Sequence, residues 1–201
     1  VYDLDGTVYD DTTHFELYAK EIQAHLPAQK HEGFWEDYSR TIFGKHPALR
    51  VGTFYDVQRD LILITKHGEV TRALHWDGSE LPPIIRRELY REPLKPDYHS
   101  LLNVGDLWWV PAAISFHYGG EVEKHQQAFL RIRDIMSDPE YKVRPIPELA
   151  ETLESLRGKV VQVLATNSPQ PDSESILGKV DLMGRFDKMY FNSGKPMGLK
   201  R

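Results

Sequence analysis

The residues best suited to chemistry stand at the beginning of the chain, in the segment Asp3-Leu4-Asp5-Gly6-Thr7. Residues 1–5 fit the end of a strand, in which alternate side chains share a face. If the chain bends after Asp3, the carboxylates of Asp3 and Asp5 can point into one cavity past the strand end, where open α/β sheets place ligands. Gly6 permits a sharp turn there, and the repulsion between two close carboxylates predicts a cation between them.

This five-residue pattern resembles the first motif of the haloacid-dehalogenase-like superfamily, in which Asp-x-Asp-Gly-Thr follows an apolar strand. The resemblance implies that Asp3 attacks phosphorus and forms an aspartyl-phosphate. It also implies that Asp5 protonates the leaving oxygen and then activates water. Covalent catalysis with general acid–base help divides one difficult displacement into two easier steps. The alternative interpretation is an ordinary Asp-Gly turn whose carboxylates lie in solvent.

Two later segments match further motifs of the same superfamily and stand in the same order. Thr166 and Asn167 come directly after the apolar run 160–165, and the resemblance implies that both bind the transferring phosphoryl group. Lys195 in Ser193-Gly194-Lys195-Pro196 resembles the third motif, whose ammonium binds the phosphate and offsets its charge. Taken alone, such a threonine also suits a turn, and such a lysine also suits a solvated surface.

The resemblance also implies a Mg²⁺ cofactor. Asp3 would supply a carboxylate and Asp5 its backbone carbonyl, while water and phosphate would complete a shell of hard oxygen ligands. The superfamily places a further acidic ligand some tens of residues after the third motif, and this chain ends six residues after Lys195. We expect that ligand in sequence beyond Arg201; its absence would instead indicate a non-catalytic relative.

The pattern around these residues alternates between strands and helices. The apolar run 160–165 suits a strand covered on both faces, as in parallel α/β sheets. A helix is expected to begin near Pro147 and to end at Gly158, and another is expected over 173–180. A short strand is expected over 188–191. The fold class is therefore predicted as α/β with a parallel sheet, and the resemblance implies that this sheet is Rossmann-like and of the haloacid-dehalogenase-like type.

The segment between the first and second motifs is well over a hundred residues long, and the resemblance implies that this segment forms a cap domain that covers the site. We expect the core domain over 1–12 and 145–201, and the cap domain over 13–144. The cap is predicted to be large and mostly helical, with room for one β-hairpin. Its expected helices span 10–27, 32–43, 82–90, 107–118 and 121–136, and the strands of the hairpin span 60–65 and 70–76.

Composition excludes several classes of protein. The 201 residues contain no cysteine, which excludes disulfides and thiolate metal sites. The formal net charge is -5 and no run of lysine and arginine forms a basic stripe, which argues against a nucleic-acid partner. No stretch approaches the roughly 20 apolar residues of a membrane span. We therefore expect a cytoplasmic protein without a membrane partner. The resemblance implies a small phosphorylated substrate, and the oligomeric state stays open.

Together the motifs predict a Mg²⁺-dependent phosphatase that hydrolyses a small phosphorylated metabolite. A dehalogenase is disfavoured, because those relatives lack the second aspartate, which is Asp5 in this chain. A phosphomutase stays open, because the same nucleophile serves both reactions. A catalytically inactive binding or scaffold protein on the same fold is the alternative from a different class.

Overall fold

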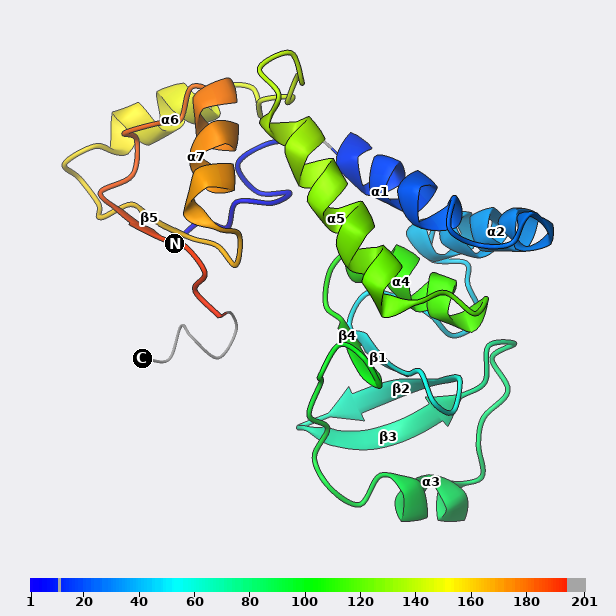
Figure 1. Cartoon of the computed structure of the whole chain (residues 1–201). Helices are drawn as coiled ribbons and strands as arrows, with labels where there is room; N and C mark the ends of the chain where they lie inside the picture. Colours follow the sequence, from blue (N-terminus) through cyan, green and yellow to red (C-terminus); the bar gives the residue numbers. More distant parts are fainter. Residues whose placement is uncertain (11, 195–201) are drawn as a thin grey trace. The chain divides into compact units, whose positions relative to one another are not determined.

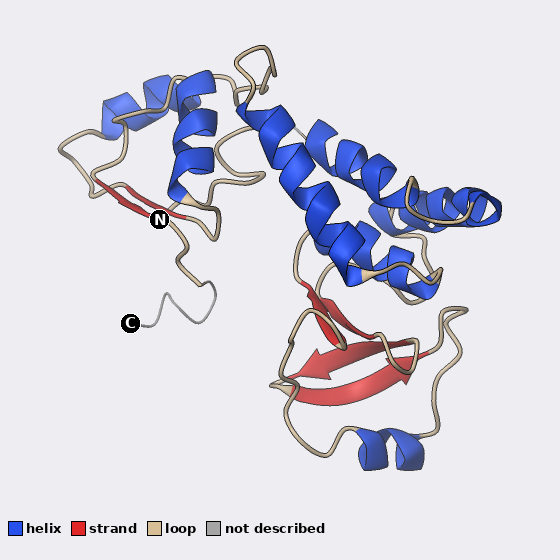
Figure 2. Ribbon diagram, in the orientation of Figure 1, coloured by secondary structure: helices blue, strands red, loops and turns tan. Residues whose placement is uncertain are grey.

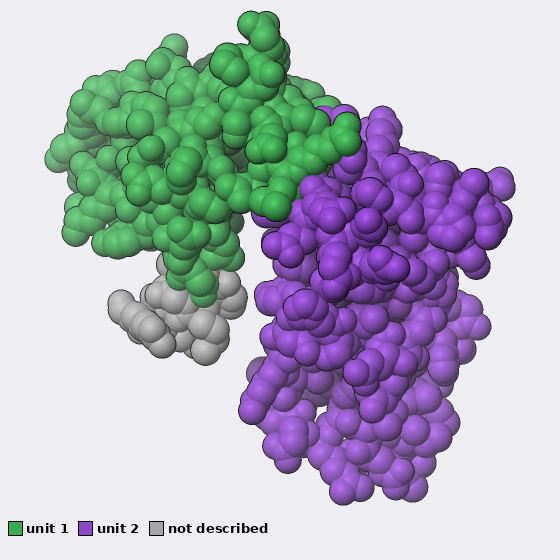
Figure 3. Space-filling view, viewed as in Figure 1, with its two compact units in different colours: residues 1–14, 130–201 green, residues 15–129 purple. Residues whose placement is uncertain are grey.

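The computed structural model describes residues 1–10 and 12–194, and it divides into two compact units (Figure 1). Unit 1 comprises residues 1–14 and 130–201, and unit 2 comprises residues 15–129 (Figure 3). Each unit has a hydrophobic core cluster of its own.

The chain passes between the units within two helices, α1 (Thr13–Gln23) and α5 (Val122–Ser137). The predicted division into a core over 1–12 and 145–201 and a cap over 13–144 stays a prediction. Both helices were expected, although α1 is shorter at each end than the pattern over 10–27 indicated.

Unit 1 contains a small parallel β-structure and the helices that accompany it. After α5 its elements are α6 (Leu149–Leu156), β5 (Val163–Ala165), α7 (Gln170–Lys179) and β6 (Lys188–Tyr190). Strands β5 and β6 pair in parallel, and α7 makes the crossover that a parallel pair requires. Tyr2 adds an isolated parallel bridge to Leu164. Three segments therefore lie side by side in the order Tyr2, β5, β6.

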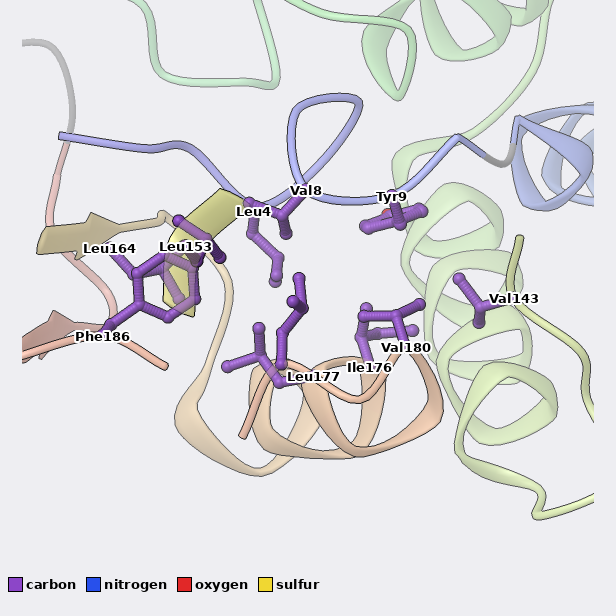
Figure 4. Close-up of a cluster of buried hydrophobic side chains, with 11 residues drawn as sticks. Leu4, Val8, Tyr9, Val143, Leu153, Leu164, Ile176, Leu177, Val180 and Phe186 are labelled. Carbon is purple, nitrogen blue, oxygen red and sulfur yellow. The ribbon is translucent and has the colours of Figure 1, made fainter. Parts of the chain in front are cut away.

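The core of unit 1 ties the first ten residues to the helices of the last third of the chain (Figure 4). Leu4 and Val8 are 1% and 0% exposed, and their side chains project toward Leu177 of α7. Full burial of one such side chain contributes about 1.5–3 kcal/mol, so these residues hold the N-terminal segment in place. The other buried members of the cluster are Tyr9, Val143, Leu153, Leu164, Ile176, Val180, Leu182 and Phe186.

The strand predicted over 160–165 is shorter than expected and occupies only its last three positions. Val160 and Val161 are 51% and 70% exposed, because the chain is still leaving α6 at that point. Gly158 ends α6 in the left-handed conformation (φ +73°), as the sequence indicated. The Gln162 side chain donates to the carbonyl of Leu153 at 2.8 Å, and β5 begins directly after this contact.

The mixed α/β composition is confirmed, but a full Rossmann-like parallel sheet is not shown. Within residues 1–10 and 12–194, parallel pairing is limited to the short segments around β5. The larger sheet is antiparallel and lies in unit 2.

Unit 2 combines helices with a four-stranded antiparallel sheet of order β3-β2-β1-β4 (Figure 2). Between α1 and α5 its elements are η1 (Ala28–Lys30), α2 (His31–Ile42), β1 (Thr53–Asp56), β2 (Leu61–Lys66), β3 (Glu69–Leu74), α3 (Pro83–Leu89), β4 (Leu101–Val104) and α4 (Trp109–His117). This segment therefore holds more β-structure than the predicted cap, because β1 and β4 extend the expected hairpin.

The predicted hairpin is confirmed as strands β2 and β3. Its two-residue turn consists of His67 and Gly68, which both have positive φ (54° and 86°). Such turns match the right-handed twist of the flanking strands. The pairing shifts by one position between Ile64 and Thr65, which marks a β-bulge.

Helix α1 buries one apolar face. In α1 the side chains of Phe15, Ala19 and Ile22 are 7%, 0% and 1% exposed. Trp108 packs edge-on against Phe15 and Phe129, with ring centroids 5.2 Å apart in both pairs. Among the described residues, no helix combines the length and the apolar character that crossing a membrane requires.

We predict that His125 makes unit 2 sensitive to acid. Burial, with a smaller contribution from His25, lowers the pKa of His125 from 6.5 to about 4. Between these values the folded protein keeps His125 neutral while the unfolded chain binds a proton, so the free energy of unfolding falls as the pH drops. Replacing His125 by Gln should remove on the order of 3 kcal/mol of this loss between pH 7 and pH 4.

The measurement is urea unfolding at a series of pH values. The control is His99→Gln, because His99 is exposed. If His125→Gln keeps the same pH dependence of stability as the wild type and this control, His125 does not titrate as proposed.

Candidate active site

The first-motif segment is held against β5 by backbone hydrogen bonds. The Tyr2 N–H donates to the carbonyl of Val163 at 2.7 Å, and the Ala165 N–H donates to the carbonyl of Tyr2 at 2.9 Å. The two segments run parallel and end at the same edge, where Asp3 follows Tyr2 and Thr166 follows Ala165. The carboxyl ends of parallel strands are the usual position of ligands in open α/β folds.

A tight turn follows Asp3 and directs Asp5 back toward β5. The N–H groups of Thr7 and Val8 both donate to the carbonyl of Leu4, at 3.2 and 3.1 Å. Gly6 has φ +67°, a conformation that favours glycine. Asp3 itself is exposed, and its Oδ1 accepts a hydrogen bond from the N–H of Leu4 at 2.7 Å.

Asp5 is held by two hydroxyl groups that come from distant parts of the sequence. Its Oδ1 accepts a hydrogen bond from the phenol of Tyr9 at 2.6 Å. Its Oδ2 accepts one from the hydroxyl of Ser168 at 3.1 Å. The carboxylate of the first motif therefore contacts the loop that follows β5.

Thr166 is fully buried at the end of β5 and organises the loop after it. Its N–H donates to the carbonyl of Tyr190, and its carbonyl accepts from the N–H of Ser193, both at 2.9 Å. Its Oγ1 accepts from the N–H of Ser168 at 3.0 Å. A hydroxyl that accepts this bond can still donate its own hydrogen.

The segments after β5 and β6 stay together beyond the strand ends. The side chain of Asn167 is exposed, and its Oδ1 accepts from the hydroxyl of Ser193 at 3.3 Å. The N–H of Asn192 donates to the carbonyl of Ser168 at 3.1 Å. Lys195, the predicted phosphate-binding lysine, lies outside the described residues.

The structure thus brings four of the five predicted site residues to one strand edge. Asp3 and Thr166 follow adjacent parallel segments, and Asp5 contacts the loop that also carries Asn167. Their roles in binding and catalysis stay predictions.

Tyr9 and Ser168 were not singled out by the sequence, although both contact Asp5. The signal for Tyr9 was its position four residues after Asp5. In a helix-like turn that spacing places two side chains on the same side, and the Val8 N–H does bond to the carbonyl four residues before it. The signal for Ser168 was its position two residues after the predicted phosphate-binding threonine.

Asp3 and Asp5 offer the kind of ligand that Mg²⁺ prefers. Their carboxylate and carbonyl oxygens are hard donors, and water with phosphate commonly fills the remaining positions around this ion. Within residues 1–10 and 12–194, no group of three His, Asp or Glu side chains lies together as a metal site. Asp3 and Asp5 therefore fit Mg²⁺ in donor type and would supply only part of its coordination.

Several histidine and aromatic side chains of unit 2 have partners inside that unit. Tyr118 and Trp76 both donate to Oδ2 of the buried Asp37, each at 2.8 Å. His117 lies 2.9 Å from Asp60 and stacks on Trp76, with ring centroids 3.9 Å apart. The hydrogen bond from His117 contributes to holding the pKa of Asp60 below its usual range, despite the opposing effect of burial. These contacts explain the polar side chains as part of the packing of unit 2.

Comparison with known proteins adds little to this description. No protein-family model matches the chain, and no curated protein matches it. Among solved structures, it is similar to a Thermotoga maritima protein assigned as a beta-phosphoglucomutase, with 17% sequence identity and a TM-score of 0.32. The match covers 94% of this chain and 59% of the other. A likeness this low defines neither a family nor an activity.

We predict that Thr166 supports the loop through its hydroxyl group. Thr166→Val keeps the size of the side chain but leaves the N–H of Ser168 without its acceptor. The free energy of unfolding should fall by about 1–3 kcal/mol, measured by chemical denaturation. Thr166→Ser is the matched control, since it keeps the oxygen and loses only a methyl group. A valine variant as stable as the wild type would show that this hydrogen bond does not support the loop.

Proposed function

We propose that this protein is a Mg²⁺-dependent phosphatase that hydrolyses a small phosphorylated metabolite through an aspartyl-phosphate intermediate. The observation that carries the proposal is the hydrogen bond between Ser168 and Asp5. It joins the turn of the first motif to the loop of the second, beside the strand ends that Asp3 and Thr166 follow. A chance resemblance in the sequence gives no reason for these two segments to meet.

In the first step, a carboxylate oxygen of Asp3 attacks phosphorus as the bond from phosphorus to the leaving oxygen breaks. Asp5 in its protonated form gives its proton to the leaving oxygen, so that a neutral alcohol departs. The hydroxyl of Thr166 donates to an equatorial phosphoryl oxygen and holds the group in line. The product is a mixed anhydride between Asp3 and phosphate.

In the second step, Asp5, now a carboxylate, removes a proton from a water molecule that attacks the same phosphorus atom. The bond from phosphorus to the Asp3 oxygen breaks, inorganic phosphate leaves, and both aspartates regain their starting states. One carboxylate thus serves as acid and then as base.

The negative charge of the phosphate and the aspartates calls for cations in the proposed site. The carboxylate of Asp3 and the carbonyl of Asp5 would bind Mg²⁺, which when bound offsets the negative charge that the phosphate and carboxylate share. Lys195, outside the described residues, is proposed to donate to the phosphoryl oxygens.

We predict that Asp3→Asn abolishes hydrolysis of p-nitrophenyl phosphate by the full-length protein in the presence of Mg²⁺. An amide is a far weaker nucleophile than a carboxylate and forms no aspartyl-phosphate. The matched control is Asp181→Asn, because Asp181 is a carboxylate of the same unit whose side chain is 94% exposed. Release of p-nitrophenolate measures the rate. Equal rates for wild type and Asp3→Asn would reject Asp3 as the nucleophile, and a wild type without turnover would favour the scaffold alternative.

We also predict that EDTA abolishes this hydrolysis and that added Mg²⁺ restores it. Ca²⁺ should restore it less, because it prefers more ligands at longer distances than the compact octahedral shell of Mg²⁺. The readout is the same initial rate, measured after dialysis against each ion. Full activity of the EDTA-treated protein without added metal would contradict the metal requirement.

A further inference from the structure

We propose that Tyr9 is a positioning residue that holds one carboxylate oxygen of Asp5 and leaves the other, Oδ2, to carry the catalytic proton. The inference rests on the proposed function and assigns separate roles to the two oxygens of the proposed acid–base group. It is argued from the different lengths of the hydrogen bonds that Tyr9 and Ser168 donate to that group.

The two hydrogen bonds to Asp5 differ in length. The bond from Tyr9 to Oδ1 is 2.6 Å long, within the range of strong bonds between a hydroxyl and a charged oxygen. The bond from Ser168 to Oδ2 is 3.1 Å long, beyond the usual 2.7–2.8 Å. Oδ1 is therefore the firmly held oxygen, and Oδ2 is the one whose partner is easily exchanged.

Tyr9 is also anchored so that its hydroxyl cannot follow a rotation of Asp5. The residue is 1% exposed and belongs to the core cluster of unit 1. Its backbone forms an antiparallel bridge to Pro145, and the next N–H, that of Asp10, donates to the carbonyl of Arg144 at 2.9 Å. The phenol is thus a fixed point against which the carboxylate is oriented.

Ser168 is suited to the opposite role. Its side chain is only half-buried, and a serine hydroxyl turns freely about one bond. Its backbone stays held by Thr166 Oγ1 and by the N–H of Asn192, so the hydroxyl can turn without moving the loop. When a proton occupies Oδ2, the Ser168 hydroxyl gives up its bond to that oxygen and can accept one from it.

The consequence concerns the step in which the leaving group departs. The bond between hydrogen and Asp5 Oδ2 breaks and the proton passes to the leaving oxygen, as the phosphorus–oxygen bond breaks and Asp3 bonds to phosphorus. A basic leaving group such as phenolate needs this proton more than p-nitrophenolate, which is stable as an anion. Loss of the Tyr9 hydroxyl should therefore slow poor leaving groups selectively.

The experiment compares kcat/KM of the full-length protein for phenyl phosphate and p-nitrophenyl phosphate with Mg²⁺ present. For each substrate, kcat/KM reports the steps up to and including departure of the leaving group. In Tyr9→Phe we expect kcat/KM to fall by about tenfold for phenyl phosphate and by less than about threefold for p-nitrophenyl phosphate. The tenfold loss is only a fraction of the full effect of a general acid, because Asp5 itself remains. A merely structural loss would lower both substrates by the same factor.

Two further variants make the assignment specific. Tyr55→Phe is the matched control, since Tyr55 is also 1% exposed and donates to a carboxylate, that of Asp60, at 2.7 Å. It should leave the ratio between the two substrates unchanged. Ser168→Ala should change both rates by the same factor. A selective loss in Ser168→Ala would overturn the assignment of the two oxygens, even if Tyr9→Phe failed to fold.

The outcomes separate this inference from the function on which it rests. A wild type that hydrolyses neither phosphate ester, or an Asp3→Asn variant that keeps its activity, would reject the proposed function. An active wild type with an inactive Asp3→Asn variant, combined with a Tyr9→Phe variant that slows both substrates equally, would reject the role of Tyr9 alone.

Discussion

The contact between Asp5 and the loop after β5 is the interaction on which the candidate site depends. Its two partners, Asp5 and Ser168, are separated by 163 positions in the sequence. They meet because Tyr2 pairs with the backbone of Val163 and Ala165, so that two parallel segments end at one edge. Without that pairing, the carboxylates of the first motif would lie on a solvent-exposed turn.

Buried side chains on both sides of the turn hold its backbone in one position. Leu4, Val8 and Tyr9 are almost fully buried, whereas Asp3 between Tyr2 and Leu4 is exposed. The apolar residues therefore hold the backbone while the polar residues between them face the strand edge. The same buried tyrosine that packs in the core also holds Asp5, so the core of unit 1 and the orientation of the proposed acid–base group are linked through one side chain.

Local patterns predicted much of the secondary structure, and the reasons for the failures are physical. The hairpin of β2 and β3 followed from two apolar runs around His67-Gly68, which is a short-range signal. Strands β1 and β4 were missed, because each has only four residues and β4 pairs with β1 across a long stretch of sequence. In the site, the motif predicted Asp3, Asp5 and Thr166, but Tyr9 contacts Asp5 only through the geometry of the turn, which no motif specifies.

The central claim is that the carboxylate of Asp3 becomes phosphorylated during turnover. Borohydride reduces an aspartyl-phosphate to homoserine, and mass spectrometry of the peptide that contains residues 3 and 5 locates the modified residue. During steady-state hydrolysis with Mg²⁺, the account predicts homoserine at position 3 and unmodified aspartate at position 5. Hydrolysis at full rate without reduction of residue 3, or with the modification at another carboxylate, would contradict it.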